Sequence, residues 1–145
     1  MPYAPHDQLD QSDYLSILSR APAEEVKRFV DSLIPALGPI EVVGNRTGLV
    51  MVPTTDPAQG AAFYLGEVLV AEAQVRLGDA EGYAACLGRD VEQALAIGLI
   101  DAAIVAGRAR EQIAPFILEQ SAALDQAEQR LQEQLEATRV EMETF

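Results

Sequence analysis

The stretch GYAACLGRDVEQALAIGLIDAAI, residues 82–104, combines a strand, a junction and an apolar helix in one short segment. Tyr83 to Leu87 is typical of a strand, and Gly88 lets the chain leave it sharply. From Asp90 to about Ala106 the pattern is helical and apolar nearly all round. Such a helix is covered on more than one side, either as the core helix on a sheet or at an interface.

The Gly88-Arg89-Asp90 junction has two interpretations. Asp90 and Gln93 form a capping-box pattern, in which the carboxylate accepts the amide of Gln93 and Gln93 returns to the cap amide. Alternatively, Arg89 lies beside the positive end of the helix dipole and binds a phosphate there, which makes it a candidate substrate-binding residue. The capping interpretation is favoured, because a capping carboxylate occupies the amides that an anion needs.

Asp101 is a carboxylate within this apolar helix and is the second candidate substrate-binding residue. A buried carboxylate must find a partner or shift its pKa. We expect an ion pair with an arginine such as Arg76 or Arg89, or a contact with another subunit. A role as general base is the second interpretation.

Before this segment the sequence predicts a helical pair and then a sheet. Residues 1–9 predict a flexible arm, and residues 10–145 a single α+β domain. One helix starts at Asp10, and a second covers Ala23 to Leu33 and ends at Pro35. About four antiparallel strands follow, joined by short links with turn chemistry at Gly44-Asn45-Arg46. They are Ile40–Val43, Gly48–Pro53, a strand within Phe63–Leu77, and Tyr83–Leu87.

The last part of the chain predicts one long helix, from about Phe116 to Met142, after an interruption at Pro115. Its apolar stripe is narrow and resembles a coiled-coil seam. A helix of about 25 residues spans roughly 38 Å, which is longer than a domain of this size covers alone. We therefore expect the helix to reach a partner or to form a homo-oligomer with a second copy. The candidate interface residues are Leu124, Leu131, Leu135 and Met142.

Composition excludes several functions. The formal net charge is −13, which argues against a nucleic-acid partner and an anionic membrane surface. No apolar run approaches a membrane span and no secretory signal is visible, so a cytoplasmic location is expected. One cysteine (Cys86) and one histidine (His6) make a metal site or a Cys–His pair improbable. No nucleotide-binding or nucleophile motif occurs, so we expect no cofactor bound by this chain and assign no catalytic residue.

A series of short motifs, in order over residues 10–145, resembles the PhnG family, the G subunit of the bacterial carbon–phosphorus lyase system. The best anchor is Gly-Arg-Asp followed by Ile-Asp-Ala. The motifs are Thr47-Gly-Leu-Val50, Leu65-Gly-Glu-Val68, Val75-Arg-Leu77, Gly82-Tyr83, Gly88-Arg-Asp90, Leu99-Ile-Asp-Ala102 and Ala137-Thr-Arg-Val140.

The resemblance implies a role in phosphonate catabolism, in a core complex with the H, I and J subunits. With the I, H and L proteins, the family is associated with forming α-D-ribose 1-methylphosphonate 5-triphosphate from ATP and methylphosphonate, with release of adenine. ATP, as its magnesium complex, is then a substrate of the assembly. The resemblance favours a non-catalytic structural partner of the I subunit, which is generally taken as the nucleosidase centre. Direct contribution of Arg89 or Asp101 to that active site is the alternative.

Overall fold

The computed structural model describes the backbone of residues 10–143 and the side chains of residues 10–139. The predicted fold class, α+β, is confirmed, although the antiparallel sheet has three strands in the order β1-β2-β3 and not four. The predicted arm, residues 1–9, lies outside the described residues. The elements are α1 (Gln11–Arg20), α2 (Ala23–Leu37), β1 (Glu41–Thr55), β2 (Ala62–Leu77), β3 (Ala80–Leu87), α3 (Val91–Ala106) and α4 (Arg110–Glu143).

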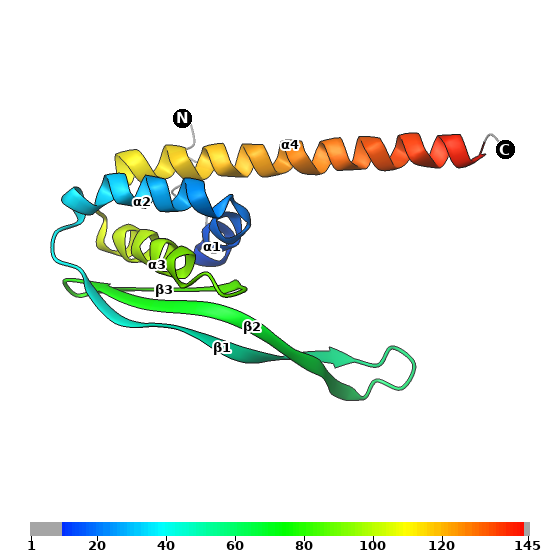
Figure 1. The fold of residues 1–145 in the computed structure, drawn as a ribbon, viewed down its shortest axis with the longest axis horizontal. Helices are drawn as coiled ribbons and strands as arrows, with labels where there is room; N and C mark the ends of the chain where they lie inside the picture. Colours follow the sequence, from blue (N-terminus) through cyan, green and yellow to red (C-terminus); the bar gives the residue numbers. More distant parts are fainter. Residues whose placement is uncertain (1–9, 144–145) are drawn as a thin grey trace.

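Helix α3 lies at the centre of the molecule, between the sheet and the other helices (Figure 1). One side of α3 packs on β2 and β3, and its other sides contact α1 and α2. Ile97 and Ile100 are almost completely buried, as the apolar pattern predicted. Within residues 10–143, no helix is both long enough and apolar enough to span a membrane.

The backbone of α3 lies very close to β3 at Gly82. A Cβ atom added to Gly82 would lie 2.3 Å from the carbonyl oxygen of Gly98 and 2.4 Å from the amide nitrogen of Ala102. Both distances are far shorter than van der Waals contact, so no side chain fits between this strand and the helix. Glycine at residue 82 therefore sets how closely the core helix sits on the sheet.

The predicted turn at Gly44-Asn45-Arg46 is wrong, because β1 continues through these residues and merges the first two predicted strands. The pairing with β2 shifts register between Val42 and Gly44, which marks a β-bulge. The extra residue is Val43, which the register leaves without a partner. Gly44 pairs with Gln74, and Asn45 and Arg46 then pair regularly with Ala73 and Glu72 of β2. Glycine and asparagine therefore mark an irregular strand here and not its end.

Two prolines that were expected to limit helices lie inside them. Pro35 is in the last turn of α2 and Pro115 is near the start of α4. A proline in a helix leaves the carbonyl of the fourth preceding residue without its helical donor. These carbonyls belong to Asp31 and Glu111, which are exposed residues, so water can supply the missing hydrogen bond.

Substitution of Gly82 by alanine should destabilise the full-length chain by about 1–3 kcal/mol, because the new methyl group collides with helix backbone that cannot rotate away. Urea unfolding followed by circular dichroism measures the change. Gly48→Ala is the matched control, since a Cβ atom there meets nothing within 4 Å. The control should be unchanged or more stable, by less than about 1 kcal/mol. Equal stability of the two variants would contradict the close approach.

Candidate functional site

Asp101, one of the two candidate site residues, is completely buried at the junction of three elements. Its carboxylate accepts hydrogen bonds from the hydroxyl group of Tyr14 and from Gln11 Nε2, at 3.1 and 3.2 Å to the two oxygens. The backbone amide of Tyr83 donates a further bond of 2.9 Å. Asp101 thus ties α3 to α1 and to β3.

The predicted arginine partner of Asp101 is wrong, because all three donors are neutral groups. Arg76 lies on the opposite face of the sheet from α3 and pairs there with Glu41 and Glu81, at 3.3 and 2.8 Å. Burial, and then the adjacent carboxylate of Asp101, raise the pKa of Tyr14 well above its usual value of 10.0, so the hydroxyl group stays a donor. In this chain a ligand could reach Asp101 only if Gln11 and Tyr14 moved away.

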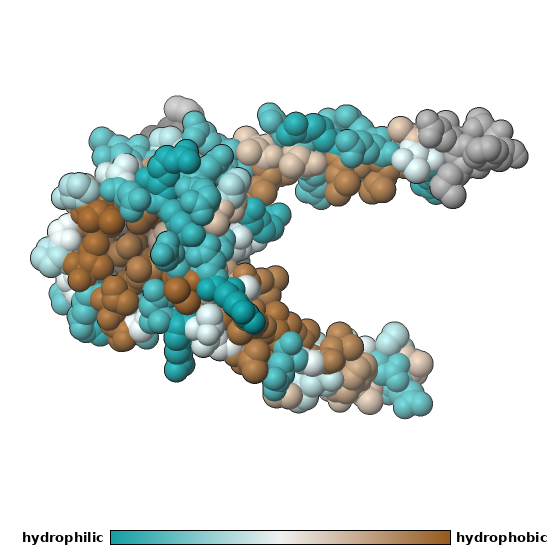
Figure 2. Space-filling model, in the orientation of Figure 1, coloured by the Kyte–Doolittle hydropathy of each residue, from teal (hydrophilic) through white to brown (hydrophobic). Residues whose placement is uncertain are grey.

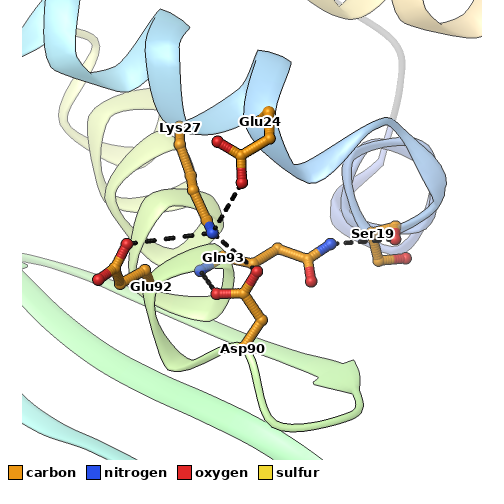
Figure 3. A network of polar contacts seen from close by, with 6 residues as sticks. All are labelled: Ser19, Glu24, Lys27, Asp90, Glu92 and Gln93. Atoms are coloured by element: carbon orange, nitrogen blue, oxygen red, sulfur yellow. Dashed lines mark hydrogen bonds and ion pairs between the residues drawn. The ribbon is translucent and has the colours of Figure 1, made fainter.

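Asp90 caps the N-terminus of α3, as the sequence predicted (Figure 3). Its Oδ1 accepts the amide of Gln93 at 3.0 Å, and its Oδ2 lies 2.8 Å from Nζ of Lys27 on α2. The same ammonium group lies 3.4 Å from Glu24 and 4.0 Å from Glu92. The only lysine of the chain therefore joins α2 to the start of the core helix.

The return bond predicted for the capping box is wrong. The side chain of Gln93 points away from the cap amide and donates to the carbonyl of Ser19, 3.5 Å away at the end of α1 (Figure 3). Gln93 is buried, so it satisfies its amide group against a neighbouring helix. The junction is thus held by contacts to α1 and α2 that local sequence does not reveal.

Arg89, the other candidate site residue, is exposed beside this cap. Within the part of the chain that the structure describes, its side chain makes no hydrogen bond or ion pair. Lys27 and the amide of Gln93 hold the pKa of Asp90 below its ordinary value of 3.8, so Asp90 stays charged and occupies the helix N-terminus. Arg89 is available to a ligand, but the Gln93 amide next to it is already occupied.

Helix α4 contains the predicted interface stripe, and the structure divides it in two. Near the core, Phe116 stacks on Phe29 of α2, with ring centroids 3.9 Å apart, and Leu124 packs against the main core. Further on, Leu131 and Leu135 are 56% and 61% exposed. The backbone of Met142 is helical, but its side chain lies outside the described residues.

The exposed part of the stripe points in the same direction as the buried part. At 3.6 residues per turn, Leu131 and Leu135 lie within about 20° of Leu124 around the helix axis. The face of α4 that packs on the core therefore continues beyond it, where no element of residues 10–143 covers it. Figure 2 shows apolar surface on this side of α4, facing the arm formed by β1 and β2.

The arm formed by β1 and β2 is a second uncovered apolar surface, and sequence reasoning missed it. Beyond the end of β3 the two strands project from the core on the same side as α4 (Figure 1). We call residues 49–55 and 62–69 the distal ribbon. A usable signal was present, since residues 49–69 hold only two charged side chains, Asp56 and Glu67. Its most exposed large apolar residues are Leu49, Val50, Met51, Tyr64 and Leu65.

The described residues offer little for direct chemistry. They contain no group of three or more His, Cys, Asp or Glu side chains able to hold a metal ion. Cys86 is buried, and burial raises the pKa of its thiol, which opposes thiolate formation. The most prominent exposed features of the described residues are two apolar arms, the outer half of α4 and the distal ribbon.

The family model for the phosphonate metabolism protein PhnG matches residues 10–145. The chain belongs to the PhnG family. It is similar to the α-D-ribose 1-methylphosphonate 5-triphosphate synthase subunit PhnG of Rhizobium meliloti (strain 1021), with 32% identity over 134 residues. The alignment covers 90% of this chain and 85% of that PhnG protein. The capped core helix and the two arms are therefore features of a PhnG chain.

Substitution of Lys27 by methionine should lower the melting temperature near neutral pH, and the loss should shrink in acid. The folded pKa of Asp90 is depressed below 3.8, so its pair with Lys27 stabilises the fold above that pH and is lost as the pH falls through the folded pKa. The pKa of Lys27 is raised above 10.5, so the pair is also lost in strong base. Thermal unfolding of both proteins at about pH 7 and about pH 3 measures the change.

The control for this effect is the double variant Glu24→Gln/Glu92→Gln, which keeps the bond between Lys27 and Asp90. When Lys27→Met is introduced into this background, the loss of melting temperature that it causes should still be smaller at acid pH than at neutral pH. A deficit in melting temperature that stays constant from about pH 7 to about pH 3 would show that Asp90 is not the partner that matters.

Proposed function

We propose that this chain is a subunit of α-D-ribose 1-methylphosphonate 5-triphosphate synthase, within the carbon–phosphorus lyase core complex, and acts there as a non-catalytic structural partner of the I subunit. The name of the Rhizobium meliloti relative and the family match support the synthase assignment. The H and J subunits are the further partners proposed. ATP, as its magnesium complex, and methylphosphonate are substrates of the assembly, which releases adenine.

The structural role rests on the apolar stripe of α4 formed by Leu124, Leu131 and Leu135, which we call the α4 seam. This seam continues past the core with its apolar side chains exposed. An isolated helix gains most of its stability from packing of its apolar face. The outer half of α4 keeps such a face at Leu131 and Leu135 without a covering element in the described part of this chain. A neighbouring subunit that packs on this seam completes the helix.

The arrangement of polar groups also supports a non-catalytic role. Asp101 is buried and bonded by three donors, and Asp90 is used by the helix cap and Lys27. A general acid or base must reach the proton that it transfers. These two carboxylates instead join the helices to one another and to the sheet.

Two glutamates introduced on the seam should detach the chain from the complex. The full-length chain is co-expressed with the I, H and J subunits and recovered through a tag on the I subunit. We expect the wild type to co-purify and Leu131→Glu/Leu135→Glu to lose at least about tenfold in recovery, equivalent to about 1.4 kcal/mol of binding. Buried charges without partners strongly oppose association.

The matched control is Gln129→Glu/Ala137→Glu, which adds the same two charges on the opposite side of α4, where both residues are exposed. It should co-purify like the wild type. The structural role fails if the I subunit is equally soluble and active when this chain is absent.

A direct role in the active site is the second candidate function. It is favoured by the exposed side chain of Arg89 at the N-terminus of α3, which pairs with no other residue in the described part of the chain. Arg89 binds substrate in this alternative, and Asp101 contributes to binding or to proton transfer. Arg89→Ala should then lower synthase activity by at least about tenfold while the complex stays assembled. Under the structural role the variant keeps full activity. Synthase turnover and co-purification, measured on the same preparation, distinguish the two functions.

A further inference from the structure

The distal ribbon begins where β3 stops. β3 pairs with β2 as far as Leu87, opposite Val70, and the amide of Gly88 adds a last bond of 2.9 Å to the carbonyl of Leu69. Beyond this point β2 has only β1 as a neighbouring strand in the sheet. The distal ribbon is thus a two-stranded structure that no third strand extends.

The strand register assigns the ribbon side chains to two faces. Thr47 pairs with Ala71, whose side chain is buried against the core, so Leu49 with Leu69 and Met51 with Glu67 continue that face. The pair Val50 and Val68 lies on the other face, which carries Arg46 and Glu72 nearer the core. Successive residues of a strand point to opposite faces.

Both faces of the distal ribbon are mainly apolar and exposed, and Glu67 on the first face is its only charged side chain. On the first face Leu49 is 63% and Met51 51% exposed, and on the second face Val50 is 50% exposed. A solvated antiparallel sheet usually has one apolar and one polar face, whereas a strand covered on both faces is apolar throughout. An isolated two-stranded hairpin is also only marginally stable in water. The composition of the ribbon is therefore that of a structure buried on both sides.

We propose that the distal ribbon inserts into an apolar cleft of a different protein, which covers both of its faces. The proposal rests on the proposed function, since the synthase supplies that protein. It differs from the α4 seam, which needs cover on one side only. Figure 2 shows the ribbon as an apolar arm that stands clear of the helical layers.

The net charge of the chain favours one kind of partner for the ribbon over others. Two copies of this chain would bring together two bodies of net charge −13, which repel each other. An anionic membrane is repelled for the same reason. A protein that carries basic residues around an apolar cleft matches both the ribbon and the acidic body behind it, so the partner is a less acidic subunit and not a second copy.

The test compares double variants on the two faces, made in the full-length chain and added to the complex of the remaining subunits. Leu49→Thr/Met51→Thr changes the first face and Val50→Thr/Val68→Thr the second, and threonine retains strand propensity. The control is Ile34→Thr/Val105→Thr, which removes two apolar residues that are 42% and 57% exposed on α2 and α3. Each ribbon variant should bind at least about tenfold more weakly than the wild type, and the control should bind equally well.

Two outcomes of this comparison overturn the proposal. If only one face matters, the ribbon lies on a partner surface and is not inserted. If the wild type assembles and both ribbon variants assemble equally well, insertion fails while the proposed function stands. A wild-type chain that does not join the other subunits at all contradicts the proposed function, and insertion fails with it.

Amide hydrogen exchange of the wild type provides a measurement that does not depend on how well the variants fold. Exchange at residues 49–52 and 66–69 should be fast in the isolated chain and at least about tenfold slower in the complex. Unchanged exchange overturns the proposal. Protection in the isolated chain with a dimeric mass by light scattering, or protection by phosphatidylcholine vesicles, assigns the ribbon to a second copy or to lipid and also overturns it.

Discussion

The contact between Gly82 of β3 and the backbone of α3 is the constraint on which the rest of the structure depends. Because no side chain separates them, α3 lies directly on the strand, and Asp101 comes within hydrogen-bond distance of the amide of Tyr83. The carboxylate is then too deep for solvent and must be satisfied by protein donors. Gln11 and Tyr14 supply them, so the same contact also fixes the position of α1.

The two arms follow from a mismatch in length around this contact. α3, with 16 residues, is about 24 Å long, and β3, with 8 residues, about 26 Å, so helix and strand cover each other. β1, with 15 residues, spans roughly 50 Å, and α4, with 34 residues, roughly 51 Å. About half of each longer element therefore extends past the core. The greater length of β1 and α4 therefore leaves the distal ribbon and the outer part of α4 without an element of the described residues to cover them.

Sequence predicted what depends on local signals and missed what depends on distant partners. The cap of α3 was predictable because Asp90 and the backbone amide that donates to it, at Gln93, are three residues apart. The donors to Asp101 were not, since Gln11 and Tyr14 lie 90 and 87 residues away and α1 shows no sign of them in its own pattern. Gly44-Asn45-Arg46 predicts a turn, because glycine tolerates both a turn and an irregular strand. Only the pairing with β2, in which Val43 is the extra residue, distinguishes the two.

The strong acidity of the chain and the low charge of the distal ribbon act together on the choice of partner. Residues 49–69 hold two of the 23 acidic side chains and none of the 10 basic ones. An exposed apolar arm favours association with any similar surface, including that of a second copy. A body of net charge −13 opposes approach of that second copy at long range, and leaves the arm free for a chain of different charge. The charge that opposes binding to nucleic acid and anionic membranes therefore also opposes self-association and favours a heterologous partner.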